Sequence, residues 1–278
     1  MKRREMLLTT GAAVLGISAF PVGWAAAAKK NVEKKKVLYF TRSAGFVHSV
    51  VKRGGKDLAY SEKILKELGE KHGFEVVCSQ DPKVFDGDLG QYDVIAFYTS
   101  GNPISAEQKT KLLEAVGAGK GFVGIHAATD SFRSSGVDPY IAMIGGEFLT
   151  HASQQKAKMK VVSPKFPGVE GLGDGFEMME EWYAFQKFAP DLHVVLVQET
   201  EGMHDRPYQR PPFPATWARM QNKGRVFYTS MGHREDVWTN PKFQQVLLGG
   251  LSWTARNVEA DVTPNIAQVT PKANELKK

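Results

Sequence analysis

Short apolar runs alternate with helix-like spacings over residues 36–256. Apolar runs rich in β-branched and aromatic residues predict strands at 36–41, 74–78, 92–99, 121–126, 158–162, 193–198 and 225–231. Apolar residues at helical spacing predict helices at 58–72, 105–116 and 241–256, with Ser105 as an N-cap and Gly73 as a C-cap. Near-continuous apolar strands alternating with amphipathic helices predict an α/β fold whose mostly parallel central sheet is covered on both faces.

Histidines gather where the predicted strands end. His48, His126, His151 and His233 each follow a predicted strand or a glycine-containing turn, and ligands of open α/β sheets bind beyond the carboxyl ends of the strands. A single histidine at such a place is more often a structural group. Four of them, from distant segments, predict a shared site.

Adjacent carboxylates precede two aromatic residues at 180–183 (EEWY). Because neighbouring residues of an extended segment point to opposite faces, we expect Glu180 or Glu181 to enter the site and the other to meet solvent. Such a pair cannot be the facing carboxylates of ordinary glycoside hydrolysis. Trp217 and Trp238 are either sugar-stacking residues or part of the core.

Several chemistries are excluded by the sequence. Cys78 lies within an apolar run and has no sharp turn after it, which makes it a poor nucleophile, and no G-x-S-x-G motif is present. The segment 117–121 (GAGKG) precedes a strand and lacks the spacing of a phosphate loop, so we interpret it as a turn and expect no nucleotide cofactor.

The first 28 residues have the pattern of an export signal. Lys2, Arg3 and Arg4 precede an apolar stretch that ends in alanines, which predicts a cleaved twin-arginine signal peptide and a periplasmic or secreted protein. The alternative is a single membrane anchor; after cleavage we expect no stable membrane association. Removing 1–28 takes away three basic residues and one acidic residue, so the net charge falls from +6 to +4. No basic run is interleaved with aromatics, so we expect no nucleic-acid partner.

A lone cysteine rules out an intramolecular disulfide, so the core must hold the fold together. About 250 residues remain after removal of the signal, enough to bury a large core. We predict one domain over 29–260 and a flexible C-terminal tail over 261–278. The oligomeric state is not indicated by the sequence.

The motifs at the strand ends, read together, resemble the ThuA-like family, named for trehalose utilisation. The resemblance rests on 45–48 (GFVH), 119–128 (GKGFVGIHAA), 145–151 (GGEFLTH), 181–183 (EWY), 214–217 (PATW), 224–228 (GRVFY) and 232–233 (GH). It departs from the family pattern at Lys120, Ala152 and Glu180, where glycine, proline and aspartate are usual. Since Glu180 differs, Glu181 is the better candidate for the inward carboxylate.

The resemblance implies a flavodoxin-like three-layer sandwich similar to class I glutamine amidotransferases. The nucleophile elbow of those enzymes corresponds to 125–127, where His126 stands in place of cysteine, so amidotransferase activity is not expected. The family's association with sugar dehydrogenases implies a disaccharide or keto-sugar substrate. A ketone acidifies the neighbouring C–H, which permits proton abstraction followed by elimination, isomerisation or hydrolysis.

The leading hypothesis is therefore an exported enzyme acting on a small carbohydrate. Its expected catalytic residues are His126, Glu181, His151 and His233; those expected to bind substrate are His48, Asp130, Tyr183, Trp217 and Trp238. Three imidazoles plus water would suit zinc or another divalent ion, with His126, His151 and His233 as ligands. The alternatives are a non-catalytic carbohydrate-binding or accessory protein and an exported amidase or peptidase-like hydrolase. The proline-rich loop at 204–214 is either a rim over the site or a plain connector.

Overall fold

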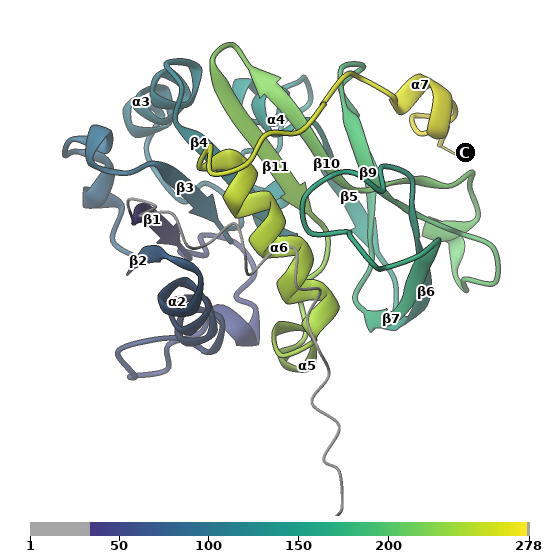
Figure 1. The fold of residues 1–278 in the computed structure, drawn as a ribbon, viewed down its shortest axis with the longest axis horizontal. Helices are drawn as coiled ribbons and strands as arrows, with labels where there is room; N and C mark the ends of the chain where they lie inside the picture. Colours follow the sequence, from purple (N-terminus) through teal and green to yellow (C-terminus); the bar gives the residue numbers. More distant parts are fainter. Residues whose placement is uncertain (1–33, 277–278) are drawn as a thin grey trace, which may run out of the picture. The chain divides into compact units, whose positions relative to one another are not determined.

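The computed structural model describes residues 34–276, and the predicted signal segment at 1–28 lies outside them. Within the described residues the strands form one nine-stranded sheet, in the order β2-β1-β3-β4-β11-β10-β9-β6-β7, and one two-stranded sheet, β5-β8 (Figure 1). The strands are β1 (Lys35–Phe40), β2 (Phe74–Ser79), β3 (Val94–Phe97), β4 (Gly121–Ile125), β5 (Glu147–His151), β6 (Gln155–Val161), β7 (Gly175–Glu180), β8 (Tyr183–Gln186), β9 (His193–Gln198), β10 (Phe213–Gln221) and β11 (Gly224–Thr229).

The predicted parallel sheet is confirmed in its central part. Strands β2, β1, β3, β4 and β11 pair in parallel, and the residues of β3, β4 and β11 are all buried. Burial on both faces explains why these strands are continuous apolar runs. Beyond β11 the sheet continues through β10, β9, β6 and β7 in antiparallel pairings. The protein is therefore α/β with a mixed sheet that is parallel at its core.

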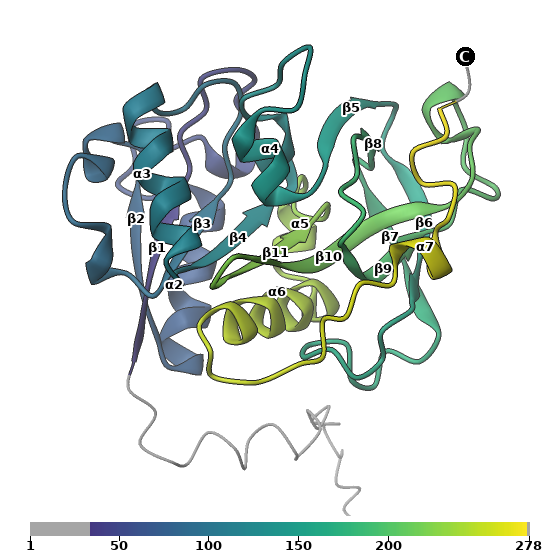
Figure 2. The same ribbon diagram turned by 90° about the horizontal axis from the view of Figure 1, so that it is seen from above.

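Helices cover both faces of this sheet, as Figure 2 shows. One face carries α2 (Tyr60–His72), α5 (Glu235–Trp238) and α6 (Pro241–Thr254), and the other carries α3 (Ala106–Gly117) and α4 (Pro139–Ile144). The predicted caps are confirmed: Gly73 ends α2 with φ 80°, and Ser105 accepts a hydrogen bond from Gln108 N at 3.2 Å at the start of α3. The result is the predicted three-layer arrangement.

Seven helices and strands of the described residues were missed by the apolar pattern. They are α4, α5, α7 (Ile266–Val269), β5, β7, β8 and β10. Helix α4 has six residues, too few to display a helical period, and the outer strand β7 alternates buried and exposed residues, as a strand with one solvated face does. Strand β5 ends in polar residues, and the last of them, His151, lies 3.4 Å from Glu181.

The expectation of a flexible C-terminal tail is wrong for residues 265–274. The side chain of Asn265 bonds both backbone groups of Val194, and Ile266, at the start of α7 (Ile266–Val269), is buried. The buried Arg210 guanidinium donates to the carbonyl of Ala273, and Asn274 bonds both backbone groups of Phe188. Polar side chains anchor this segment, which is why no apolar period marks it. Within residues 34–276, none of the helices has the length and apolar character that a membrane crossing requires.

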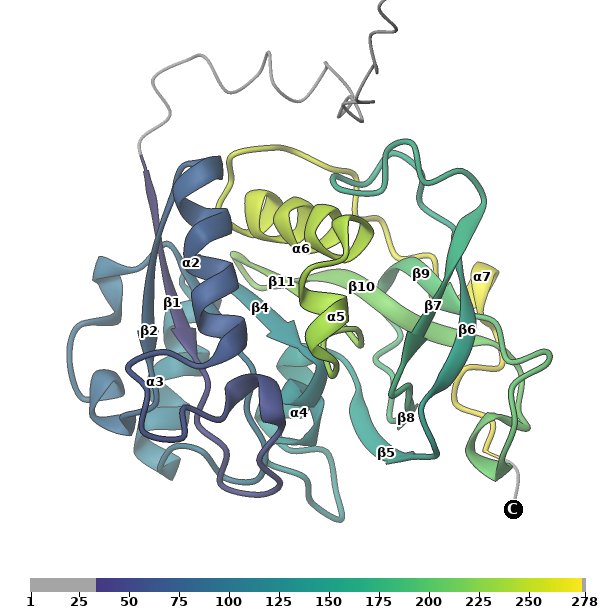
Figure 3. The same cartoon turned by 90° about the horizontal axis from the view of Figure 1, so that it is seen from below.

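The carboxyl ends of the parallel strands face the two-stranded sheet. Strand β4 leads directly into the 3₁₀ helix η4 (His126–Asp130), against which β5 packs (Figure 3). The loop after β1, the turn after β11 and the link between β7 and β8 reach the same region. These connections carry the candidate site.

Candidate functional site

His126 occupies a strained elbow at the end of β4. Its φ is +44°, in the left-handed region that residues other than glycine adopt rarely, and its side chain is fully buried. The Nδ1 atom lies 2.7 Å from the carbonyl oxygen of Ser230, so it carries the proton and donates. The other nitrogen, Nε2, therefore presents a lone pair, and it has no hydrogen-bond partner among residues 34–276.

Three imidazoles form a nearly equilateral triangle. The ring centroids are 5.0 Å apart for His48 and His126, 5.1 Å for His48 and His233, and 5.2 Å for His126 and His233. Separate segments supply them: the loop after β1, the elbow after β4 and the turn after β11. The chain thus brings together side chains that are up to 185 positions apart, since 233 minus 48 is 185.

Glu181 lies against this triangle. One carboxylate oxygen, Oε2, is 3.0 Å from His233 Nδ1 and 3.6 Å from His126 Nε2, and Oε1 is 3.4 Å from His151 Nδ1. Burial raises the pKa of Glu181, but the neighbouring His126 and His233 imidazoles outweigh it and hold the pKa well below the usual range. The carboxylate is therefore ionised and is the negative member of the group.

His48 is neutral. Burial, followed by the nearby His126 and His233 rings, lowers its pKa to about 2. Its Nε2 lies 3.3 Å from the Tyr183 hydroxyl, while Nδ1 is buried without a hydrogen-bond partner among the described residues. In the tautomer that donates through Nε2 to the Tyr183 oxygen, the Nδ1 lone pair is left for a ligand.

Glu180 supports the site from below, and the expectation that it meets solvent is wrong. Its side chain is fully buried. Its Oε2 atom accepts hydrogen bonds from the backbone N–H groups of Gly232 and His233 at 2.8 and 3.1 Å. Oε1 accepts from Glu181 N at 2.8 Å. Burial raises the pKa of Glu180 to about 7, although these backbone donors oppose the shift. This residue fixes the turn that presents His233.

The donor set suits a divalent metal ion. One ligand atom from each of His48, His126, Glu181 and His233 can be chosen so that all lie within 4.8 Å of one another. Imidazole nitrogens and carboxylate oxygens are both zinc ligands, and ligand atoms around one ion lie about 3 Å apart when the bonds are about 2 Å. The unpartnered nitrogens of His48 and His126 are the atoms that such an ion would satisfy. The residues therefore fit a metal after a modest inward shift.

The group that the structure brings together differs from the predicted ligand set. His126 and His233 belong to the group, but His48 and Glu181 complete it instead of His151. The His151 side chain is 45% exposed and lies at the outer edge, with Nδ1 3.0 Å from the carbonyl oxygen of Ala152. Its ring stacks on Tyr183, which in turn lies 4.0 Å from the His126 ring, centroid to centroid.

Trp217 and Trp238 do not line the site. Both are fully buried, and their indole N–H groups donate to the backbone carbonyls of Ile144 and Gly232 at 2.7 and 2.8 Å. A sugar has no access to either ring, so the substrate-binding role expected for them is wrong and they belong to the core. Trp238 still matters to the site, because it holds Gly232 next to His233.

Asp130 and several residues that sequence reasoning missed lie beside the group. Asp130 ends η4, and burial raises its pKa despite the ion pair with Arg133 at 3.0 Å. The missed residues are Phe46 and Glu147, which the motifs at 45–48 and 145–151 contain, together with Arg133 and Gln186. Gly45 and Gly146, which precede Phe46 and Glu147, were a signal, because a glycine lets the backbone lie close to another group.

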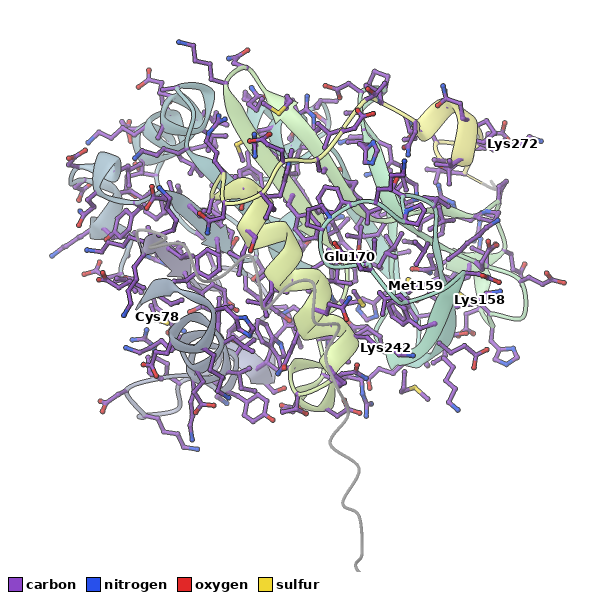
Figure 4. The ribbon with its side chains drawn as sticks, viewed as in Figure 1. Cys78, Lys158, Met159, Glu170, Lys242 and Lys272 are labelled. Carbon is purple, nitrogen blue, oxygen red and sulfur yellow. The ribbon has the colours of Figure 1, made fainter. Side chains whose placement is uncertain are left out.

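Cys78 is remote from this chemistry. It lies on β2 beside α2 (Figure 4), with its thiol 3.8 Å from the carbonyl oxygen of Glu62. Burial raises the pKa of Cys78 to about 12, so the thiol is protonated at neutral pH. The structure agrees with the expectation that Cys78 is a poor nucleophile.

Fold and site together define an α/β protein with a histidine elbow and a buried His₃Glu group at the strand ends. The model of the ThuA family, described as trehalose utilisation, matches residues 36–254, and the chain belongs to this family. Among curated proteins, none matches this sequence at a significant level.

Solved structures share the fold. A putative ThuA-like protein from Parabacteroides merdae is 19% identical, with a TM-score of 0.65 over 84% of this chain and 94% of that one. One from Bacteroides uniformis is also 19% identical, with a TM-score of 0.64 over 81% and 93%. A β-galactosidase from Bacillus circulans is 11% identical, with a TM-score of 0.51 over 84% of this chain but 32% of that one. These likenesses establish the fold alone.

Zinc binding tests the ligand set. We expect the protein without residues 1–28 to bind about one zinc ion. His48→Ala, His126→Ala or His233→Ala should weaken binding more than about 100-fold, because second-shell changes alone cost 10- to 100-fold. His151→Ala should retain zinc. Elemental analysis and competitive chelator titration provide the measurement.

His193→Ala is the matched control, since this histidine bonds the carbonyl oxygen of Thr263 at 2.8 Å, away from the group. A His151→Ala protein that loses zinc as completely as His126→Ala would show that the assigned ligands are wrong.

Proposed function

We propose that this protein is an exported enzyme of sugar utilisation that removes a proton beside the ketone of a keto-sugar. The observation that carries the proposal is the buried His48, His126, Glu181 and His233 group, whose unpartnered ring nitrogens suit a divalent ion. Membership of a family described as trehalose utilisation supports a carbohydrate substrate.

A bound divalent ion such as zinc would supply Lewis acidity to the substrate's ketone oxygen. The protein's own groups fix the geometry around that oxygen. Ser230 and Tyr183 hold the rings of His126 and His48, and Glu180 holds the turn that carries His233. A rigid and largely dry arrangement of this kind favours charge developing on an oxygen during the reaction.

His151 is the group best placed to take the proton. Its Nδ1 donates to the carbonyl oxygen of Ala152, so Nε2 carries the lone pair, and the side chain reaches solvent at the edge of the site. Glu181 Oε1, at 3.4 Å from Nδ1, would stabilise the imidazolium that forms. The substrate C–H proton passes to Nε2, the C–H electron pair forms a C=C bond to the carbonyl carbon, and the carbonyl π pair moves to the ketone oxygen, giving an enediolate. Return of the proton to the former carbonyl carbon, or to the other face of its original carbon, isomerises the sugar. In an elimination the ketone re-forms while the substituent β to it leaves with its bonding pair and takes the proton from the His151 imidazolium.

In this proposal His126 is a metal ligand, whereas the sequence placed it both among the catalytic residues and among the ligands. Its complete burial and its place among the inner nitrogens favour a ligand role. An amidotransferase-type reaction is not supported, because the elbow carries an imidazole and Cys78 lies elsewhere with its pKa at about 12.

Proton abstraction is measured directly by deuterium exchange. With keto-trehalose (trehalose carrying one ring ketone) in D₂O, we expect zinc-loaded wild type to exchange the hydrogen next to the ketone, followed by NMR. His151→Gln should slow exchange by about 10²- to 10⁴-fold, the usual contribution of a general base, while keeping its zinc.

Binding of keto-trehalose without exchange or consumption would contradict the enzyme proposal and favour a non-catalytic binding protein. Exchange that persists unchanged in His151→Gln would assign the base elsewhere. Trehalose itself, which has no ring ketone, is the negative control.

The proposal of export is based on the sequence of the first 28 residues, which lie outside the described part of the chain. We expect Arg3→Lys combined with Arg4→Lys to block passage through the twin-arginine route, because that route requires the arginine pair. Fractionation of cells expressing the full chain, with immunoblotting of each fraction, measures the result. Equal amounts of periplasmic protein from both versions would contradict twin-arginine export.

A further inference from the structure

An open polar cavity of about 430 Å³ lies at the end of η4 and the start of β5. We call it the polar cavity; its lining includes Gly45, Asp130, Arg133, Ser134, Glu147 and Gln186. The volume falls within the range of small-molecule sites. The proposed chemistry at the His₃Glu group does not use these side chains.

The polar cavity is built from the same segments as the His₃Glu group and its surroundings. Helix η4 begins with His126 and ends with Asp130, so at about 2 Å of rise per residue the two lie roughly 8 Å apart along the helix. The loop after β1 supplies both Gly45 and His48. Strands β5 and β8 supply Glu147 and Gln186 to the cavity and also carry His151 and Tyr183, which contact Glu181 and His126. A ligand longer than one sugar ring would extend from one to the other.

Glu147 is a buried carboxylate with an unused oxygen. The residue is 1% exposed, and Oε1 accepts from both Gln186 Nε2 and Lys187 Nζ at 2.7 Å. Oε2 is buried and has no hydrogen-bond partner among residues 34–276. Leaving a buried carboxylate oxygen unpaired is costly, and Glu147 is among the residues that line the polar cavity, so a ligand hydroxyl that donates to Oε2 would remove this cost.

Charges around the polar cavity are balanced. Glu147 pairs with Lys187, and Asp130 pairs with Arg133 at 3.0 Å. Lys187, held at φ +57°, also donates to the carbonyl oxygens of Ser134 and Gly136 at 2.8 and 2.6 Å. Two carboxylates matched by two cations favour a neutral ligand with many hydroxyl groups over an ion.

An exposed aromatic residue directly follows the cavity-lining Gly45 in the sequence. Phe46 is 66% exposed and lies edge-on to His48 with ring centroids 4.9 Å apart. Its carbonyl oxygen accepts from Ser100 Oγ at 2.8 Å, which fixes the loop. An accessible ring next to polar groups suits the apolar C–H face of a sugar. This is the stacking position that was expected of the tryptophans.

We propose that the polar cavity is the subsite for the second, non-reacting ring of a disaccharide, with Glu147 accepting hydrogen bonds from its hydroxyl groups and Phe46 covering one face. This assignment rests on the proposed function, in which the keto ring lies at the His₃Glu group. It makes the protein selective for keto-disaccharides over keto-monosaccharides.

Calorimetric binding of keto-trehalose and keto-glucose tests the subsite. The zinc-loaded His151→Gln protein is the parent, because it prevents turnover. We expect the parent to bind keto-trehalose about tenfold or more tightly than keto-glucose. Adding Glu147→Gln should remove most of that preference and change keto-glucose affinity by less than about twofold, since a hydrogen bond to a charged group is lost only for the second ring.

Glu259→Gln is the matched control, because it removes an ion-paired glutamate, that of Arg225, outside the cavity. Asp130→Asn provides a second cavity variant if Glu147→Gln fails to fold. Equal affinity of the parent for both sugars, or an undiminished preference in the cavity variants, overturns the subsite. Deuterium exchange by wild type reports on the proposed function separately: exchange without a Glu147 effect refutes the subsite alone.

Discussion

The contact of one ionised carboxylate with buried imidazoles is the interaction on which the rest of the site depends. Glu181 lies 3.0 Å from His233 and 3.6 Å from His126, in a region where isolated charges are costly. The same contact lowers the pKa of Glu181 and raises that of His233, where the carboxylate outweighs the opposing effect of burial. A cation at the centre of the three rings would balance this carboxylate, which is why a metal ion is the ligand that the arrangement fits.

The fold gives that contact its rigidity. Parallel strands end together at one edge of the sheet, and the strained elbow at His126 directs its ring into the space where the loop after β1 and the turn after β11 arrive. Glu180 ties the backbone of Gly232 and His233 to the link between β7 and β8. The two-stranded sheet then encloses the site from the outer side. Placing the polar cavity next to this group needs no additional domain, since the same segments form both.

The sequence predicted the parallel strands and the main helices because their apolar periods reflect burial. It also pointed to His48, His126, Glu181 and His233, because glycine-flanked polar residues at strand ends converge in this class of sheet. It could not show that His151 lies at the edge, since strand order and side-chain direction decide which of several strand-end residues meet. Glu180 and Trp238 were misjudged for the same reason: polar and aromatic residues are often supports whose buried partners are backbone groups. The anchored C-terminal segment was missed because its contacts are made by asparagines and carbonyls, which leave no apolar period.

Anomalous X-ray scattering from zinc-soaked crystals of the mature protein tests the central claim most directly. Data collected on both sides of the zinc absorption edge locate the ion independently of any assumed ligand set. The account predicts one strong peak within bonding distance, about 2 Å, of nitrogens from His48, His126 and His233 and of a Glu181 oxygen. A peak elsewhere, or none at this position in crystals that bind zinc at other places, would contradict it.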